Sequence, residues 1–240
     1  MKYVLVTSST KGIGKAIGTL LLQHNYYVFF NYAHDDITAT QLQQELSQYK
    51  DKFSIIKADL SNLNGINILH NSITKITNKL DCIVLNTAIT DKTQFENITY
   101  DNWNNVINTN LNIPFFLVQK LSPYINNNGR IIFISALLGL IPHATSISYG
   151  VSKAGLIMLA KSLVKIFKDR KITVNTIAPG FVDTDWQLTK HLNHRQRIEN
   201  KIALKRFAYP EEIAKVCLSI IDNDYINGAV INVDGGYNFE

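Results

Sequence analysis

Tyr149 and Lys153 are the residues whose types and spacing best fit acid–base chemistry. They stand four positions apart in the run Tyr-Gly-Val-Ser-Lys, so on a helix both side chains lie on one face. A tyrosine hydroxyl has an ordinary pKa of about 10 and exchanges its proton poorly at neutral pH. A nearby ammonium stabilises the phenolate and lowers that pKa. The pair therefore predicts a phenol that exchanges a proton, supported by a lysine cation.

A second candidate site lies near the N-terminus, where residues 7–14 read Thr-Ser-Ser-Thr-Lys-Gly-Ile-Gly. An apolar run precedes this stretch and a helix-like segment follows it. The small residues allow a sharp turn, and Gly12 and Gly14 allow an anion to come close to the helix start. Free N–H groups and the helix dipole favour a phosphate there. The stretch predicts a pyrophosphate-binding loop, with a plain glycine-rich turn as the alternative.

The elements that must position these residues follow from the hydropathy pattern. Short apolar runs alternate with longer amphipathic ones, which is typical of βαβ units around a parallel sheet. We expect one α/β domain over residues 1–240, with a doubly wound, Rossmann-type parallel sheet. The polar segment 185–206 is expected to be a substrate lid or a plain surface excursion. Strands are expected at Tyr3–Thr7, Tyr27–Tyr32, Phe53–Ala58, Cys82–Leu85, Arg130–Ser135, Thr173–Ile177 and Ala229–Val233, and helices at 12–24, 38–49, 63–78, 101–121, 148–168 and 210–221.

Composition narrows the class of protein. The 240 residues are 46% apolar and 18% charged, which is typical of a globular chain. The formal net charge is +5, but no dense basic tract occurs, so we expect no nucleic-acid partner. No apolar run has the length of a membrane span and no secretory leader pattern opens the chain, so we expect a cytoplasmic protein. Cys82 and Cys217 have no metal-ligand neighbourhood, which predicts buried thiols in a reducing compartment and no metal site.

The order of these motifs resembles the short-chain dehydrogenase/reductase family over essentially the whole chain. The family loop reads Thr-Gly-x-x-x-Gly-x-Gly, and Ser8 stands here at its first glycine. The family carries Tyr-x-x-x-Lys on the helix after strand five, where Tyr149 and Lys153 occur. Asn110 matches a helix asparagine that holds a water in the proton relay. The resemblance therefore implies a nicotinamide-dependent oxidoreductase with Tyr149, Lys153 and Asn110 as its catalytic residues.

The same resemblance assigns the residues that contact the cofactor. The Val182 backbone and the Thr184 hydroxyl are expected to bind the carboxamide and to select the ring face that donates hydride. Lys153 is expected to bind the ribose hydroxyls as well. The full expected set is Ser9, Thr10, Lys11, Gly12, Ile13, Gly14, Tyr32, Asp59, Leu60, Asn86, Thr87, Ala88, Tyr149, Lys153, Pro179, Gly180, Val182 and Thr184.

The end of the second strand bears on which nicotinamide cofactor is bound. A carboxylate there would accept bonds from a ribose 2′-hydroxyl and repel a 2′-phosphate. Tyr32 stands at that position instead. Lys11 matches a basic position of NADP-preferring members and can pair with a phosphate, and His34 can add to it. We expect NADP(H), with NAD(H) as the less favoured cofactor.

Two segments depart from the family pattern. The family places a serine thirteen residues before its tyrosine, where this chain has Ala136. A hydrogen-bond donor at the reacting oxygen contributes roughly 3 kcal/mol in other enzymes. Ser135 replaces it only if the strand end bulges, and Thr145, Ser146 and Ser148 are further hydroxyls near in sequence. The segment Leu85–Ala88 carries bulkier side chains than the usual Asn-Asn-Ala-Gly, which could crowd the adenosine.

The resemblance is nearest to the 3-oxoacyl-(acyl carrier protein) reductase branch. It implies reduction of a ketone or 3-oxoacyl-type carbonyl by hydride transfer with Tyr149 as acid/base, and an acyl-thioester is one candidate substrate. It also implies a homotetramer or homodimer formed through the helices at 101–121 and 148–168. The alternative is a catalytically weak or inactive member that binds cofactor as a sensor or scaffold, which Ala136 favours.

Overall fold

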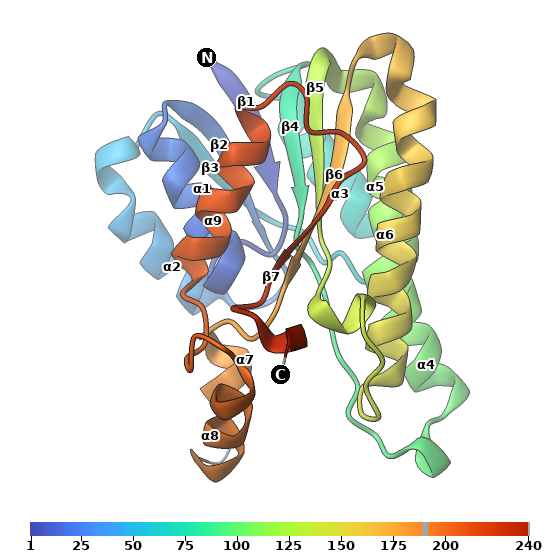
Figure 1. Ribbon diagram of the computed structural model, residues 1–240. Helices are drawn as coiled ribbons and strands as arrows, with labels where there is room; N and C mark the ends of the chain where they lie inside the picture. Colours follow the sequence, from blue (N-terminus) through green and yellow to red (C-terminus); the bar gives the residue numbers. More distant parts are fainter. Residues whose placement is uncertain (189–191, 240) are drawn as a thin grey trace.

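The computed structural model describes residues 1–188 and 192–239 (Figure 1). Seven parallel strands form one sheet in the order β3-β2-β1-β4-β5-β6-β7. This single α/β domain is the doubly wound, Rossmann-type fold that the sequence predicts. The strands span Lys2–Val6 (β1), Tyr26–Tyr32 (β2), Phe53–Lys57 (β3), Leu80–Leu85 (β4), Ile125–Ile134 (β5), Thr173–Pro179 (β6) and Val230–Val233 (β7).

Helices cover both faces of the sheet. On one face α1 packs against α9, and their buried residues share an apolar cluster with α2. On the other face α3, α5 and α6 share a second cluster. The helices span Gly12–Gln23 (α1), Asp36–Glu45 (α2), Leu63–Thr74 (α3), Tyr100–Ile107 (α4), Ile113–Leu121 (α5), Ile147–Phe167 (α6), Asp185–Leu188 (α7), Leu192–Lys201 (α8) and Pro210–Ile221 (α9).

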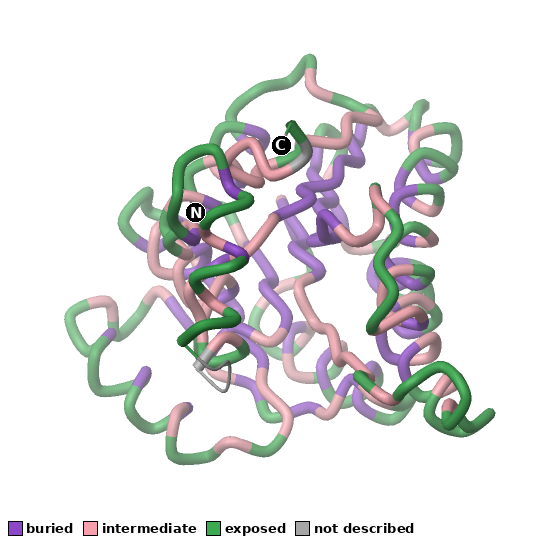
Figure 2. The backbone as a smooth tube through the Cα atoms, turned by 60° about the horizontal axis from the view of Figure 1, so that its bottom comes forward, coloured by how far each residue is buried: buried purple, intermediate pink, exposed green. Residues whose placement is uncertain are grey.

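The strands are apolar runs because both faces of the sheet are covered. Val4, Leu5 and Val6 of β1 are fully buried, as are Ile131, Ile132 and Phe133 of β5. Buried segments accordingly fill the centre of the molecule, whereas exposed ones lie on the outer turns (Figure 2). None of the helices in the described part of the chain is long and apolar enough to cross a membrane.

Several expected elements differ from the structure in their end residues, and two differ more strongly. The expected helix 101–121 is interrupted by a π-helical turn at Asn108–Asn112, which separates α4 from α5. β5 begins at Ile125 rather than Arg130, and its pairing with β4 shifts register between Leu80 and Cys82. The sequence did not predict this early start of β5, because residues 126–128 are asparagines and asparagine is uncommon in strands.

The carboxyl ends of the strands meet at the lower edge of the sheet in Figure 1. β2 and β3 lie on one side of β1, whereas β4 to β7 lie on the other, so the chain order reverses between β1 and β4. In open α/β sheets, ligands bind outside the strand ends at such a switch point. The helices α7 and α8 project beyond the same edge.

Candidate active site

The loops after β1 and β4 are joined at the switch point. The Asn86 amide nitrogen donates to the backbone carbonyls of Thr7 at 3.2 Å and Ser8 at 2.9 Å. The Thr7 hydroxyl accepts from the Asn86 backbone N–H at 2.9 Å. The Ser8 and Thr87 hydroxyls form a hydrogen bond of 2.8 Å. These contacts fix the loop that the sequence assigns to the pyrophosphate.

The geometry of residues 8–14 suits a close-approaching anion. α1 begins at Gly12, and no side chain in the described part of the chain caps its first turn. Gly12 has φ +56°, and a Cβ on Gly14 would lie 2.5 Å from the Ser8 carbonyl oxygen. Side chains larger than hydrogen therefore do not fit at Gly14. Open N–H groups in a glycine-lined turn form the kind of cradle that phosphate occupies.

Ser8 adopts φ +47°, in the left-handed region that favours glycine. This is the conformation that the family's first glycine would take without strain. Asn31, which is 1% exposed, accepts from the Ser8 backbone N–H at 3.2 Å and donates to the Ala58 carbonyl at 2.9 Å. Asn31 was not among the expected site residues, although a polar residue inside the apolar strand Tyr-Tyr-Val-Phe-Phe-Asn-Tyr indicates a special role.

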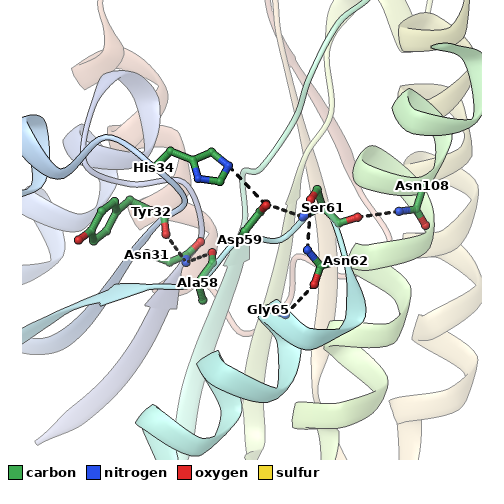
Figure 3. A network of polar contacts seen from close by, with 9 residues as sticks. All are labelled: Asn31, Tyr32, His34, Ala58, Asp59, Ser61, Asn62, Gly65 and Asn108. Carbon is green, nitrogen blue, oxygen red and sulfur yellow. Dashed lines mark hydrogen bonds and ion pairs between the residues drawn. The ribbon is translucent and has the colours of Figure 1, made fainter. Parts of the chain in front are cut away.

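The expected adenosine side lies at the ends of β2 and β3 (Figure 3). The His34 ring nitrogen Nε2 lies 3.4 Å from the Asp59 carboxylate. Tyr32 points away from Asp59 and donates its hydroxyl to Asp36 at 2.8 Å. Leu60 is buried in the core, so only its backbone can face a ligand.

Lys11 is the basic residue that the sequence assigns to a 2′-phosphate. Its ammonium lies 3.4 Å from Asp35 and 3.9 Å from Asp185. About half of the Lys11 side chain is exposed, so both ion pairs are weak. A doubly charged phosphate can therefore compete with these carboxylates for Lys11.

Tyr149 and Lys153 lie on the first turns of α6. The Lys153 ammonium lies 5.6 Å from the centre of the Tyr149 ring and donates to the Ile134 carbonyl at 2.7 Å. Burial lowers the pKa of Lys153 to about 7. Burial also raises the pKa of Tyr149 well above its usual range, which is opposite to the lowering that the sequence predicts from the lysine cation. Tyr149 therefore keeps its proton at neutral pH, the form that a proton donor requires.

Asn110 lies in the π-helical turn, a feature that is frequent at functional sites. Its side chain exchanges two hydrogen bonds of 2.8 Å with the backbone of Ile89. Its amide also donates to the Ser152 hydroxyl at 3.0 Å, and Ser152 donates to the Tyr149 carbonyl at 2.7 Å. Asn110 thus joins the loop after β4 to the helix that carries the tyrosine. Its role in holding a water stays a prediction.

The other hydroxyls near the tyrosine are placed as follows. The Ser135 hydroxyl bonds to the backbone of Lys153, and Ser148 is buried in the first turn of α6. The Thr145 hydroxyl forms a 3.0 Å hydrogen bond with His143 on the surface. Ala136 follows β5 in extended backbone and brings no hydroxyl.

The segment after β6 is the expected nicotinamide side. The Gly180 N–H donates to the Val233 carbonyl at 2.9 Å, which ties Pro179–Thr184 to β7. Val182 is buried and forms an isolated parallel bridge with Ala208. A Cβ on Gly12 would lie 3.3 Å from the Thr184 methyl group, so this segment touches the phosphate loop. One elongated ligand can therefore contact both loops.

The expected lid, 185–206, forms α7 and α8, and its residues 189–191 lie outside the described part of the chain. Trp186 lies edge-on to Tyr149, with ring centres 6.1 Å apart. Its side chain is about half exposed, so the indole forms an apolar surface next to the phenol. Sequence reasoning missed Trp186, because nothing in the local pattern predicts that contact. Among the described residues, no cluster of His, Cys, Asp or Glu can hold a metal ion.

Comparison with known proteins agrees with this geometry. The sequence profile of the family described as Enoyl-(Acyl carrier protein) reductase matches residues 7–238. The chain is 32% identical to a 3-oxoacyl-(acyl-carrier-protein) reductase of Aquifex aeolicus, covering 98% of this chain and 96% of that protein. It is 31% identical to glucose 1-dehydrogenase 2 of Bacillus subtilis, covering 98% and 94%.

A solved structure has a similar fold. The angucycline C-6 ketoreductase LanV with bound NADP superposes with a TM-score of 0.93 at 27% identity, covering 100% of this chain and 96% of that one. The chain therefore belongs to the short-chain dehydrogenase/reductase family, whose members are nicotinamide-dependent oxidoreductases.

Proposed function

We propose that this protein is an NADP(H)-dependent reductase of a ketone or 3-oxoacyl-type carbonyl, with Tyr149 as the proton donor. The observation that carries the proposal is the position of Tyr149 with Lys153, 5.6 Å from its ring, at the sheet edge that also holds the phosphate loop. The relatives whose names state an activity are reductases or dehydrogenases, and LanV was solved with NADP.

An NADPH molecule held at the strand ends would supply the hydride for the carbonyl carbon of the substrate. Tyr149 donates its proton to the carbonyl oxygen, and burial favours this protonated form of the phenol. The Lys153 ammonium then stabilises the phenolate that remains and holds the ribose hydroxyls. Because burial lowers the pKa of Lys153 to about 7, this residue exchanges its own proton in the neutral range.

We propose NADP(H) rather than NAD(H) as the cofactor because of the side chains around the end of β2. Tyr32 provides no carboxylate that would repel a 2′-phosphate, and Lys11 provides a cation beside the loop. Asp35 opposes this choice, but its pairing with Lys11 is solvent-exposed and weak. NAD(H) is the second choice.

We further propose a cytoplasmic protein that acts as a homotetramer or homodimer on a small carbonyl substrate or acyl-thioester. The support for oligomerisation is apolar surface on the two helices that the family resemblance assigns to the interface. Phe115 and Phe116 of α5 and Met158 and Ile166 of α6 are all substantially exposed. Association would remove these side chains from water.

Steady-state NADPH oxidation tests the activity. The panel contains simple ketones, aldehydes, 3-oxoacyl thioesters and aromatic ketones, with Tyr149→Phe as the comparison. We expect turnover on at least one carbonyl and a fall of about 10² to 10⁴ in kcat for the phenylalanine variant. Turnover that is equal in both proteins would contradict the proposal.

One observation favours a second function. The Ser135 hydroxyl donates its hydrogen bond to the Lys153 carbonyl, and Ala136 has no hydroxyl that could bond to a substrate. A protein without that donor can bind cofactor and act as a sensor or scaffold with little turnover. NADPH binding together with the absence of turnover on the whole panel would select this alternative.

A further inference from the structure

An ion pair joins the nicotinamide-side segment to helix α8. The Arg195 guanidinium donates to both carboxylate oxygens of Asp183, at 2.8 and 3.0 Å. Its third nitrogen donates to Glu199 at 2.9 Å. The guanidinium also lies 4.4 Å from the centre of the Phe207 ring. Bidentate pairing and stacking fix the arginine in orientation as well as in position.

Asp183 stands between the two residues assigned to the carboxamide, Val182 and Thr184. Its backbone N–H donates to the Ala208 carbonyl at 2.8 Å, and Val182 pairs with Ala208 in the isolated bridge. The backbone is therefore held from one side by Ala208, while the Asp183 side chain is held by Arg195. A shift of the aspartate moves both neighbouring residues.

Helix α8 is a firm support for this contact. Ile198, Ile202 and Phe207 form a small apolar cluster of their own, against which Phe181 and Tyr237 pack. The cluster lies apart from the two clusters that flank the sheet. Ile198 lies on α8, and Ile202 and Phe207 lie in the segment that follows it. Moving α8 together with that segment away from the residues after β6 would expose these side chains to water. The C-terminal part of the expected lid is thus anchored beside the site.

We propose that Arg195 is a positioning residue for the nicotinamide half of the cofactor, acting through Asp183 on Val182 and Thr184. The inference rests on the proposed function, because it requires that this segment binds the carboxamide. Arg195 itself touches no reacting atom. Its effect is expected to be greatest on the nicotinamide half, since Asp183 lies after β6, whereas the adenosine half lies at the ends of β2 and β3.

The electrostatics of the pair agree with a fixed contact. The Arg195 hydrogen bonds lower the pKa of Asp183, so the carboxylate stays charged through the neutral range. About a quarter of the Arg195 side chain is exposed, compared with about half for Lys11. The neighbouring Arg197 on the same helix is exposed and provides a matched arginine for comparison.

The test uses Arg195→Met, which removes the charge but keeps the stem, with Arg197→Met as the matched control. Each protein is titrated with NADP⁺ and with adenosine 2′,5′-bisphosphate, which carries only the adenosine half. We expect Arg195→Met to weaken NADP⁺ binding about tenfold and to leave bisphosphate binding within twofold. Arg197→Met is expected to bind both ligands as the wild type does.

Two further variants separate positioning from general damage. Asp183→Asn is expected to weaken NADP⁺ binding as Arg195→Met does, and the double variant to lose no more than either single one. Arg195→Lys, which keeps the charge, is expected to recover part of the loss. Unchanged NADP⁺ binding in Arg195→Met, or equal loss of both ligands, would overturn the inference. Failure of the wild type to bind NADP⁺ would instead overturn the proposed function.

Discussion

Ser135 donates its hydroxyl to the backbone carbonyl of Lys153 at 2.8 Å, and only 3% of its surface is exposed. This bond ties the end of β5 to the second turn of α6. The side chains of adjacent residues in extended backbone point to opposite faces of the sheet. Ala136 follows Ser135 in extended backbone, so its side chain points to the face opposite to that of the Ser135 hydroxyl. Of the explanations for the missing serine, a bulge that brings Ser135 to the substrate is therefore wrong in this structure.

Restoring a hydroxyl at Ala136 should raise the rate. Because a positioned donor to the reacting oxygen contributes about 10²-fold or more in other enzymes, Ala136→Ser is expected to raise kcat by about that factor. NADPH binding should stay unchanged, since the hydroxyl faces the substrate. Single-turnover kinetics at saturating NADPH measure the effect.

Ser135→Ala is the companion variant for that experiment. It removes one buried hydrogen bond, which is worth about 1 kcal/mol of folding free energy. The melting temperature should therefore fall by about 2 to 4 °C, while kcat changes little. A large loss of kcat without loss of stability would show that Ser135, and not position 136, serves the substrate.

Because Ser8 has a left-handed conformation, glycine at this position is expected to give a more stable protein than alanine. Ser8→Gly and Ser8→Ala both lose the hydroxyl bond to Thr87, so the difference between them reports the strain at φ +47°. We expect the glycine variant to be more stable by about 1 kcal/mol, or about 2 to 4 °C in melting temperature. Equal stability in calorimetry would mean that the loop relaxes in solution.

Burial of Lys153 predicts a pH-dependent stability. Its folded-state pKa of about 7 lies below the ordinary value of 10.5, so between these values the unfolded chain holds a proton that the folded chain lacks. The contribution of Lys153 to the free energy of unfolding therefore rises as the pH rises from about 7 to 10.5. Lys153→Met should be more stable than the wild type at pH 7, and the gap should shrink toward pH 10.

Denaturant unfolding of the two proteins at several pH values measures that gap. Other titrating groups are common to both proteins and cancel in the difference. A gap that stays constant from pH 7 to 10 would mean that Lys153 remains an ammonium throughout, held by the Ile134 carbonyl.

Lys11 is expected to select the 2′-phosphate. Lys11→Met should weaken NADPH binding about tenfold, because one hydrogen bond between charged groups is lost, and should leave NADH binding within twofold. Lys15→Met is the matched control, since Lys15 lies one turn further along α1 and pairs with Glu45 at 2.6 Å. Equal weakening of both nucleotides by Lys11→Met would assign the lysine to the pyrophosphate instead.

The fold was predictable because its signals are local. Runs such as Val4–Val6 alternate with amphipathic stretches, and that alternation predicts a buried parallel sheet. The expected helix 210–221 coincides with α9. The local pattern did not predict the break at Asn108–Asn112; in the structure the Asn110 side chain in this turn accepts from the backbone N–H of Ile89, which is 21 residues away in sequence.

The site was predictable only in part, because only some of its residues belong to local motifs. Tyr149, Lys153 and the glycine loop are short motifs in a recognisable context. The contact of Trp186 with Tyr149 and the pairing of Arg195 with Asp183 depend on how the chain leaves the sheet edge after β6 and returns at Ala208. No local pattern encodes that path.

A fluorescence titration of the purified protein with NADPH and, separately, NADH tests whether the strand ends hold a nicotinamide dinucleotide. We predict saturable NADPH binding well below about 1 mM, and NADH binding that is about tenfold weaker. Binding of neither nucleotide would mean that Ser8 and the loop at 85–88 close the site, and the proposed cofactor would then be wrong.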